Sequence, residues 1–472
     1  MSETTFAPPT SAPIVENPRL TVIGTGYLGA THAICMAVLG FDVLGVDVDP
    51  KKIDDLSNGI VPFYEPGLPE KLREALDSGR LHFTTDFDHA AEFGDVHFIC
   101  VGTPQAPGSD AADMRYVDSA FSELAKRIDR KALLVGKSTV PIGTAARLTS
   151  LVHSISPLGS ELELAWNPEF LREGFAVEDT LHPDRLAFGV SSEWAAAQLS
   201  AAFRPILDNG TPLVVSDLAT AELVKVAANS FLATKISFIN AMAEVCEATG
   251  ADVNLLATAL SYDSRIGGRF LKPGLGFGGG CLPKDIRAFA FRAEELGVGK
   301  AVAFLREVDE INIRRRVRTV DLIRELAGGD LQGKRIAALG AAFKPNSDDV
   351  RDAPALDVAR MLYLEGATVT VYDPEANRNA HRAYPDLEYA NSMVSAVIDA
   401  DVVALLTEWQ EFQDVSPADL GALVRTRAIV DGRHALDADA FIANGWDYRA
   451  LGRPARVGTV ELVADQRDEV SV

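Results

Sequence analysis

The segment GTGYLG at residues 24–29 constrains the fold of this chain most, because it matches the pattern G-x-G-x-x-G. It follows the strand candidate LTVIG and opens the helical segment ATHAICMAVLG, and Asp47 ends the next strand candidate, FDVLGVD. Glycines in this setting let a backbone approach a pyrophosphate at a helix N-terminus, and the acid accepts hydrogen bonds from a ribose. The pattern therefore predicts a dinucleotide site, and NAD is favoured over NADP because Asp47 disfavours a 2′-phosphate.

Strand and helix candidates alternate after this segment, with the strands VHFICVG, ALLVGKS and LAFGV. A strand-free helical run begins near Ser216, and alternation returns from Lys334 with RIAALG, TVTVYDP and AIVDGR. We expect an α/β protein with two Rossmann-like doubly wound parallel-sheet domains joined by an all-helical middle domain. The expected boundaries are a disordered tail at 1–18, domains at 19–215, 216–328 and 329–456, and a flexible tail at 457–472.

Composition narrows the classes of partner. The chain has 472 residues, and its net charge of −22 argues against binding to nucleic acid or to an anionic membrane surface. No apolar run approaches the roughly 20 residues that span a bilayer. The N-terminus has no basic leader or apolar stretch, so we expect no signal peptide. Four cysteines without pairing motifs favour a reducing cytoplasm.

Cys281 stands out among the four cysteines, because it follows the glycine-rich loop GFGGG and precedes LPKD. A helix N-terminus and a nearby cation favour a thiolate, and Pro283 and Lys284 provide both features. We expect a nucleophilic cysteine here, with a turn-filling cysteine as the alternative. The eight histidines do not cluster, so no metal site is expected.

Further polar residues have two readings each. Lys225 and Asn229 share a helix face among apolar neighbours. Lys225 either extends its ammonium group to solvent or is positioned for catalysis. In NPEFLREG, Asn167 is expected to cap a helix on which Glu169 and Glu173 share a face, either for chemistry or for the helix dipole. Thr139 follows a strand, where α/β proteins place ligand contacts.

The second α/β region lacks the glycine pattern after its first strand. The segment ALGAAFKPNSDDVRDAP offers Lys344 and Arg351 instead. These cations either hold a nucleotide or diphosphate, or belong to a solvated loop.

Taken in order, the chain resembles the UDP-glucose 6-dehydrogenase family, within the larger group of nucleotide-sugar 6-dehydrogenases. The resemblance covers roughly residues 19–455 and rests on GTGYLG, VPFYEPGL, VGTP, KSTVPIGT, NPEFLREG, VKVAANSFLATKISFIN, GGRFLKPGLGFGGGCLPKD and FKPNSDDVRDAP. It implies an NAD-binding N-terminal domain, a dimer-forming helical domain and a C-terminal UDP-binding domain. It also implies a four-electron oxidation of UDP-glucose at C6 to UDP-glucuronate, with two NAD reduced.

The resemblance assigns roles to residues of this chain. Cys281 would be the nucleophile, Lys225 and Asn229 would stabilise oxyanions, and Asp285 would hold a water or the lysine. Glu169 would be the general base for thioester hydrolysis, with Thr139 and Glu173 ordering water. The implied NAD contacts are Gly24, Gly26, Tyr27, Leu28, Gly29, Asp47, Lys52, Thr103, Thr139, Lys284 and Arg351. The implied substrate contacts are Glu169, Phe170, Leu171, Arg172, Glu173, Lys225, Asn229, Phe270, Leu271, Lys272, Pro273, Gly274, Gly278 and Lys344, with Arg265 from the partner subunit.

A covalent nucleophile makes chemical sense in such an enzyme. Only one glycine fingerprint is visible, so NADH must leave and NAD return between two oxidations, and a tether keeps the aldehyde from escaping. Gly280 departs from the family, where many relatives carry serine, and we expect the change to be tolerated. The alternatives are a GDP-mannose 6-dehydrogenase or another nucleotide-sugar 6-dehydrogenase, and, from another class, a catalytically silent NAD-binding regulator.

Overall fold

The computed structural model describes residues 13–457. Contacts within the chain divide it into two compact units, residues 1–232 with 281–306 and residues 233–280 with 307–472. Most of the two predicted tails lies outside the described residues. The tail prediction is wrong for Val15, whose backbone exchanges hydrogen bonds with the side chain of Gln198, and for Val457, which pairs in a strand.

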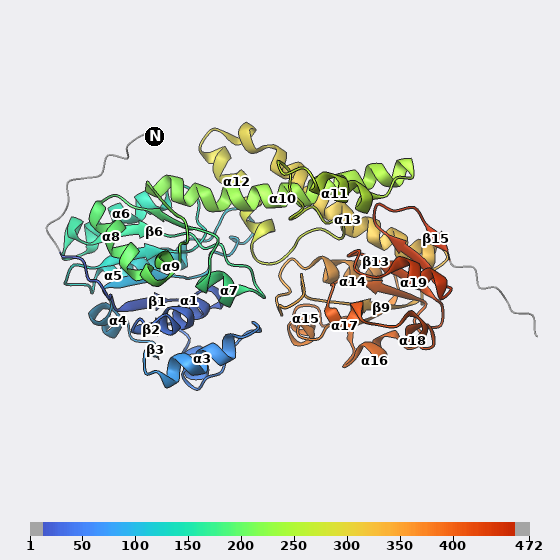
Figure 1. Cartoon of the computed structure of the whole chain (residues 1–472), viewed down its shortest axis with the longest axis horizontal. Coiled ribbons are helices and arrows are strands. Elements are labelled where there is room, and N and C mark those ends of the chain that lie inside the picture. Colours follow the sequence, from blue (N-terminus) through green and yellow to red (C-terminus); the bar gives the residue numbers. More distant parts are fainter. Residues whose placement is uncertain (1–12, 458–472) are drawn as a thin grey trace, which may run out of the picture. The chain divides into compact units, whose positions relative to one another are not determined.

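The first unit contains a sheet of eight strands in the order β3-β2-β1-β4-β5-β6-β7-β8 (Figure 1). The strands are β1 Leu20–Ile23, β2 Val43–Val46, β3 Leu81–Thr84, β4 Val96–Ile99, β5 Leu133–Gly136, β6 Glu163–Trp166, β7 Leu186–Gly189 and β8 Leu213–Ser216. All neighbouring pairs are parallel except β6 with β7, which are antiparallel. The predicted parallel sheet is thus confirmed with one antiparallel pair inside it.

Both faces of this sheet are covered, which makes it doubly wound. Alternate residues of one strand enter different cores: Val22 packs with helix α1 (Tyr27–Val38) on one face, and Ile23 packs with helix α5 (Arg115–Ala125) on the other. The helices of this unit are α1 Tyr27–Val38, α2 Pro50–Ser57, α3 Leu68–Asp77, α4 Phe87–Phe93, α5 Arg115–Ala125, α6 Thr144–Ile155, η1 Gly159–Glu161, α7 Ala176–Leu181, α8 Glu193–Ala202 and α9 Arg204–Asp208.

The region between the two sheets is helical, as predicted. It contains α10 Leu218–Thr249, α11 Val253–Ser261, α12 Leu282–Glu295, η2 Gly299–Val302 and α13 Phe304–Leu326. A short 3₁₀ turn, η2, precedes α13. None of these helices, nor any other among the described residues, is long and apolar enough to cross a membrane.

The second unit contains a sheet of seven strands in the order β11-β10-β9-β12-β13-β14-β15. The strands are β9 Arg335–Leu339, β10 Thr368–Tyr372, β11 Glu388–Tyr389, β12 Val402–Leu405, β13 Ala428–Asp431, β14 Asp447–Ala450 and β15 Arg456–Val457, of which only the β14–β15 pair is antiparallel. The helices of this sheet are α14 Pro354–Leu364, α15 Asn377–Ala383, α16 Met393–Val397, α17 Gln410–Gln413, α18 Pro417–Gly421 and α19 Ala438–Ala443. The second α/β domain is therefore confirmed.

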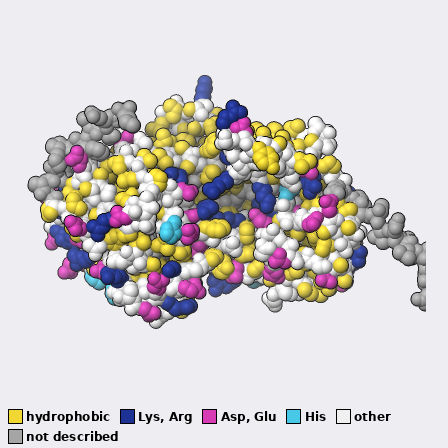
Figure 2. Space-filling view, viewed as in Figure 1, with side chains coloured by type: hydrophobic (Ala, Val, Ile, Leu, Met, Phe, Trp, Pro, Cys, Tyr) yellow, Lys and Arg dark blue, Asp and Glu magenta, His cyan; other side chains and the backbone are white. Residues whose placement is uncertain are grey.

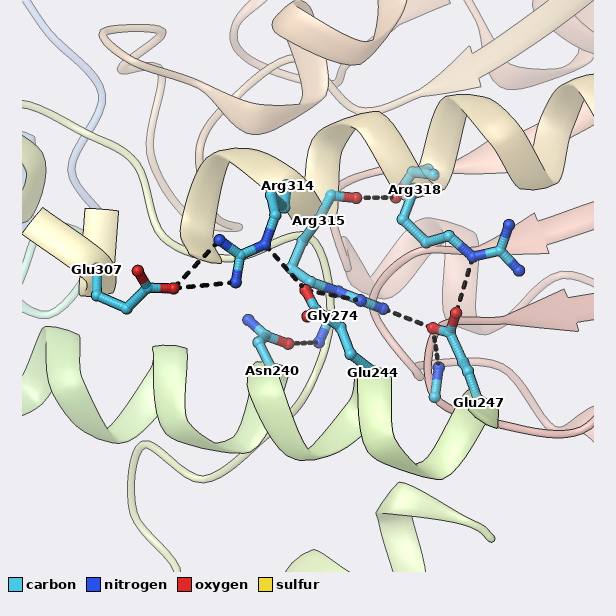
Figure 3. A network of polar contacts seen from close by, with 10 residues as sticks. Asn240, Glu244, Glu247, Gly274, Glu307, Arg314, Arg315 and Arg318 are labelled. Atoms are coloured by element: carbon cyan, nitrogen blue, oxygen red, sulfur yellow. Dashed lines mark hydrogen bonds and ion pairs between the residues drawn. The ribbon is translucent and has the colours of Figure 1, made fainter. Parts of the chain in front are cut away.

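Ion pairs between α10 and α13 organise the helical part of the second unit (Figure 3). Glu247 of α10 accepts hydrogen bonds from Arg315 at 2.7 Å and Arg318 at 2.8 Å. It also accepts one from the backbone N–H of Gly452 at 2.9 Å. Burial raises the pKa of the Glu247 carboxyl, but these donors outweigh it and hold the pKa below its usual value.

We predict that Glu247→Gln destabilises the protein by about 1–3 kcal/mol at pH 7, because Arg315 is buried and loses a charged partner. A lowered pKa stabilises the fold above the unfolded value of about 4.3, and this stability is lost as pH falls through the folded pKa. The difference from wild type should therefore shrink in acid. Denaturant unfolding of both proteins at pH 7 and at several pH values below about 4.3 measures this difference.

The matched control is Glu325→Gln, which makes the same change at an exposed partner of Arg318. Exposed pairs contribute about 0–1 kcal/mol, so this variant should unfold close to wild type. Equal destabilisation by the two variants would contradict the role given to Glu247.

Candidate active site

The predicted dinucleotide loop joins β1 to α1, and its three glycines have different surroundings. Gly24 has a φ of 90°, so it makes the tight turn. A Cβ on Gly29 would lie 1.8 Å from the carbonyl oxygen of Gly24, so only glycine allows this helix to pack there. A Cβ on Gly26 would meet no atom within 4 Å, so its backbone is open to a ligand. These are the roles that a bound pyrophosphate requires, and the loop therefore fits NAD.

Asp47 follows β2 and faces this loop. Its carboxylate accepts hydrogen bonds from the backbone N–H of Thr25 at 2.8 Å and of Asp49 at 3.0 Å, and Lys52 lies 3.3 Å away. Burial raises the pKa of the Asp47 carboxyl, but these donors hold it below its usual value. Asp47 is thus a buried anion beside the loop, in the position that a ribose hydroxyl contact needs.

Thr103 and Thr139, two further predicted contacts, are directly linked. The hydroxyl of Thr103 donates to the carbonyl of Thr139 at 2.8 Å. The loop after Thr139 is held by Glu222 of α10, which accepts from the backbone N–H groups of Gly143 and Ala145 at 2.7 and 2.6 Å. Sequence reasoning missed Glu222, and no feature of its helical segment distinguishes it from a solvated acid.

Cys281 is the N-cap residue of α12, as its position before Pro283 predicted. Four residues later, Asp285 is 2% exposed and binds two predicted site residues. Its carboxylate lies 2.5 Å from Nζ of Lys284 and accepts from Nδ2 of Asn229 at 2.7 Å. One buried carboxylate thus connects α12 to α10.

The electrostatics of Cys281 differ from the expectation. Its side chain is exposed, yet desolvation by its surroundings raises the pKa of the thiol, and the Asp285 carboxylate raises it further. Lys225 and Lys284 oppose this effect without cancelling it. The prediction that Lys284 favours the thiolate is right in direction, but the paired Asp285 outweighs it. Cys281 is therefore held as a thiol at neutral pH in this state of the protein.

The segment NPEFLREG is not a helix, so the expected capping by Asn167 and the shared helical face of Glu169 and Glu173 are wrong. The segment has no regular secondary structure and ends in a turn before α7. Glu169 instead accepts hydrogen bonds from the backbone N–H groups of Phe170 and Leu171, at 2.7 and 3.0 Å. The nearby ring of Phe170 lies 5.4 Å from Nζ of Lys225.

Glu65 is a buried residue of this unit that sequence reasoning missed. Its carboxylate accepts a hydrogen bond from the hydroxyl of Tyr27 in the dinucleotide loop. It also accepts from the backbone N–H groups of Gly174 and Ala176, at 2.6 and 2.7 Å. The available sequence signal for Glu65 was an acid within YEPGL, a segment whose Pro and Gly otherwise indicate only a turn. Glu65 fixes the dinucleotide loop to the segment that carries Glu169.

The second unit carries the other predicted contacts. Asn240 of α10 accepts from the backbone N–H of Gly274 at 2.9 Å, which anchors the segment 270–274 (Figure 3). Gly278 packs against backbone, because a Cβ there would lie 2.3 Å from the carbonyl oxygen of Asp352. Arg265 is 87% exposed and pairs with Asp263.

Arg351 and Gly280 are neighbours in this unit. The guanidinium of Arg351 pairs with Asp349 at 2.7 Å, and a Cβ on Gly280 would lie 2.3 Å from its central carbon. A serine at Gly280 would therefore displace this flexible side chain. Lys344 lies over the ring of Phe343 at 5.3 Å.

Arg433 was also missed by sequence reasoning. It donates to the carbonyls of Gly276, Phe343 and Leu406 at 2.7–3.2 Å, and so joins the glycine-rich loop to the loop that carries Lys344. Its segment, VDGRHAL, reads only as a strand end followed by a turn.

Known proteins match the chain along most of its length. Residues 18–207, 219–314 and 337–438 match the NAD binding, central and UDP binding domains of the UDP-glucose/GDP-mannose dehydrogenase family. The chain belongs to this family. The three domains of this family follow one another along the chain. The NAD binding domain contains the glycine loop at 24–29.

Individual members of the family are similar over nearly their whole length. The UDP-glucose 6-dehydrogenase of Rhizobium meliloti is 39% identical over 92% of this chain and 100% of its own. The UDP-glucose 6-dehydrogenase TuaD of Bacillus subtilis is 39% identical over 93% of this chain and 94% of its own. The solved UDP-glucose dehydrogenase of Pyrobaculum islandicum is 36% identical, with a TM-score of 0.86 over 95% of this chain and 100% of that one.

Proposed function

We propose that this protein oxidises UDP-glucose at C6 to UDP-glucuronate with NAD, through a covalent intermediate on Cys281. The observation that carries the proposal is the cluster at the start of α12, where Cys281 precedes a buried Asp285 bound to Lys284 and Asn229. A reaction that stopped at an aldehyde would need no nucleophile, whereas one that continues to an acid gains from a thioester.

NAD supplies the hydride acceptor for both oxidations when it is bound. The residues proposed to hold it are the glycine loop at 24–29 with Asp47, Lys52, Thr103 and Thr139, together with Lys284 and Arg351. The fit of the loop glycines and the buried anion at Asp47 support this assignment.

The chemistry of the chain centres on sulfur. The resting group is a thiol because its pKa is raised, so the Cys281 sulfur bonds to the aldehyde carbon while the thiol proton passes to solvent water and the C=O bond opens to an oxyanion. Lys225 and Asn229 stabilise the resulting oxyanion. After the second hydride has left the thiohemiacetal, a thioester joins C6 to Cys281.

Hydrolysis completes the reaction. Glu169 takes a proton from a water whose oxygen adds to the thioester carbon, and Thr139 and Glu173 order that water. The C–S bond then breaks, and the leaving sulfur takes up the proton of the new carboxylic acid, which restores the Cys281 thiol and releases the sugar carboxylate. The pKa of Glu169 lies below its usual value, so the carboxylate is ionised and can accept a proton from the water.

The nucleotide-sugar contacts are proposed for Phe170–Glu173, Lys225, Phe270–Gly274, Gly278 and Lys344. Arg433 joins this set because it binds two of the same loops. Acidic and basic side chains are interspersed on the face in Figure 2. The lysines and arginines among the proposed contacts would attract an anionic substrate to this acidic protein.

A homodimer is also proposed, with Arg265 reaching the partner's substrate. Two observations support it: Arg265 is exposed, and α10 exposes Phe238 and Val245, seven residues apart on one helix face, at 48% and 52%. We also propose a cytoplasmic location, which agrees with four free cysteines.

The covalent step is tested by Cys281→Ser. We expect turnover to fall by orders of magnitude while NAD and UDP-glucose still bind, because a hydroxyl ionises far less than a thiol and an ester hydrolyses more slowly than a thioester. Intact-protein mass spectrometry should find a sugar ester on the new serine, or aldehyde should be released. Cys246→Ser, the same change at a buried thiol, is the control. Wild-type turnover by Cys281→Ser would refute the covalent step.

The dimer is tested by Phe238→Glu, which places a charge on the exposed apolar face of α10. We expect the molar mass from light scattering to fall to that of one chain, and turnover to fall with it because Arg265 no longer reaches a partner. Phe304→Glu changes a phenylalanine of similar exposure on α13 and should leave the dimer intact. A Phe238→Glu dimer with full activity would exclude this face.

A further inference from the structure

A buried lysine beside the catalytic segment has no role in the reaction so far described. Lys137 immediately follows β5, and Asn167 immediately follows the neighbouring strand β6. The paired ends of these strands, Gly136 and Trp166, bring the two residues side by side. Lys137 is 3% exposed, and its Nζ lies 2.8 Å from Oδ1 of Asn167 and 3.0 Å from Oε2 of Glu169.

Asn167 is itself fixed. Its backbone N–H donates to the carbonyl of Gly136 at 2.8 Å, and its side-chain Nδ2 donates to the carbonyl of Ala187 at 3.1 Å. Asn167 therefore holds the Lys137 ammonium from one side, and the position of that ammonium is set by three neighbouring strands.

The contacts of Glu169 leave it one free acceptor position. A carboxylate has about four such positions. Among the described residues, Oε1 accepts two backbone N–H groups and Oε2 accepts Lys137, which leaves one position on Oε2. The side chain is 19% exposed, so a small molecule such as water can reach part of it.

Three buried titratable groups near the pair, His32, Cys35 and Cys100, are uncharged at neutral pH. His32 of α1 is buried and its ring nitrogens have no partner among the described residues, and burial and then Lys137 hold its pKa well below the usual value. Burial raises the pKa of Cys35 to about 12 and that of Cys100 to about 12. Lys137 is thus the cation that the Glu169 carboxylate faces in this interior, with Lys225 over the neighbouring Phe170 ring on the other side.

We propose that Lys137 is a positioning residue for thioester hydrolysis, which holds the Glu169 carboxylate so that its single open acceptor position on Oε2 faces the attacking water. The proposal rests on the proposed function, in which Glu169 is the general base. Lys137 also keeps that base ionised, because burial raises the pKa of Glu169 and the Lys137 charge contributes most to reversing this effect.

The test is Lys137→Met, assayed with UDP-glucose and NAD. Hydride transfer does not use Glu169, so the first turnover should still release two NADH per active site. Steady-state turnover should fall about tenfold to a hundredfold, the effect of losing a hydrogen bond to a charged group. The thioester on Cys281 should accumulate and be seen by intact-protein mass spectrometry. The Glu169 pKa should rise without the cation, so the acid limb of the pH profile should move to higher pH.

Two controls separate positioning from folding. Lys131→Met removes a lysine that pairs with Glu163 at 2.8 Å between the other ends of β5 and β6, and it should keep wild-type turnover and pH profile. In a Glu169→Gln background, Lys137→Met should lower steady-state turnover by less than about twofold, because the carboxylate that Lys137 positions is already absent. If Lys137→Met folds poorly, Lys137→Gln keeps a donor without charge and should show the same shift of the acid limb.

An equal loss in the wild-type and Glu169→Gln backgrounds would overturn the proposal, and so would loss of the two-NADH first turnover without thioester accumulation. Wild-type protein that releases one NADH and no acid would instead refute the proposed function, and the Lys137 proposal with it.

Discussion

The buried carboxylate of Asp285 is the interaction on which the catalytic cluster depends. It accepts a hydrogen bond from Asn229 of α10 and pairs with Lys284 of its own helix. The backbone N–H of Asp285 donates to the carbonyl of Cys281 at 2.9 Å. Such a carboxylate, 2% exposed, is stable only when paired and hydrogen-bonded. The same contacts that satisfy it therefore hold the start of α12, where Cys281 is the N-cap residue.

The charges around this cluster separate the roles of two groups. Desolvation and then the Asp285 carboxylate raise the pKa of Cys281, so the resting group is a neutral thiol. Glu169 faces Lys137, and its pKa is lowered, so the resting group is a carboxylate. Opposite pKa shifts in two titratable groups are typical of sites that need one proton donor and one proton acceptor. In our account the sulfur gives up a proton during attack, and Glu169 accepts one during hydrolysis.

The sequence predicted most of the architecture because its signals are local. The turn at Gly24, the open backbone at Gly26 and the close packing at Gly29 all follow from one glycine pattern, and Cys281 was correctly placed at a helix start. The segment at 167–174 was predicted wrongly, because Asn-Pro followed by acids is typical of a helix start. Here Glu169 uses its own backbone N–H groups and a buried lysine instead.

Residues that act over long sequence separations could not be found in the same way. Glu65 binds Gly174, 109 positions away, and Arg433 binds Gly276, 157 positions away. Neither has a local pattern that separates it from a solvated turn. Their roles arise only when the fold brings distant loops together, and a single sequence carries no direct record of such contacts.

The pH dependence of Cys281 alkylation tests most directly the claim that Asp285 governs the sulfur. Iodoacetamide reacts with thiolates, and Cys35, Cys100 and Cys246 are buried, so peptide mapping can follow Cys281 by itself. We predict a midpoint in the wild-type protein above the ordinary thiol value of about 8.5, and a lower midpoint in Asp285→Asn, because that change removes the negative charge. A wild-type midpoint below the ordinary value, or no change in Asp285→Asn, would contradict the account.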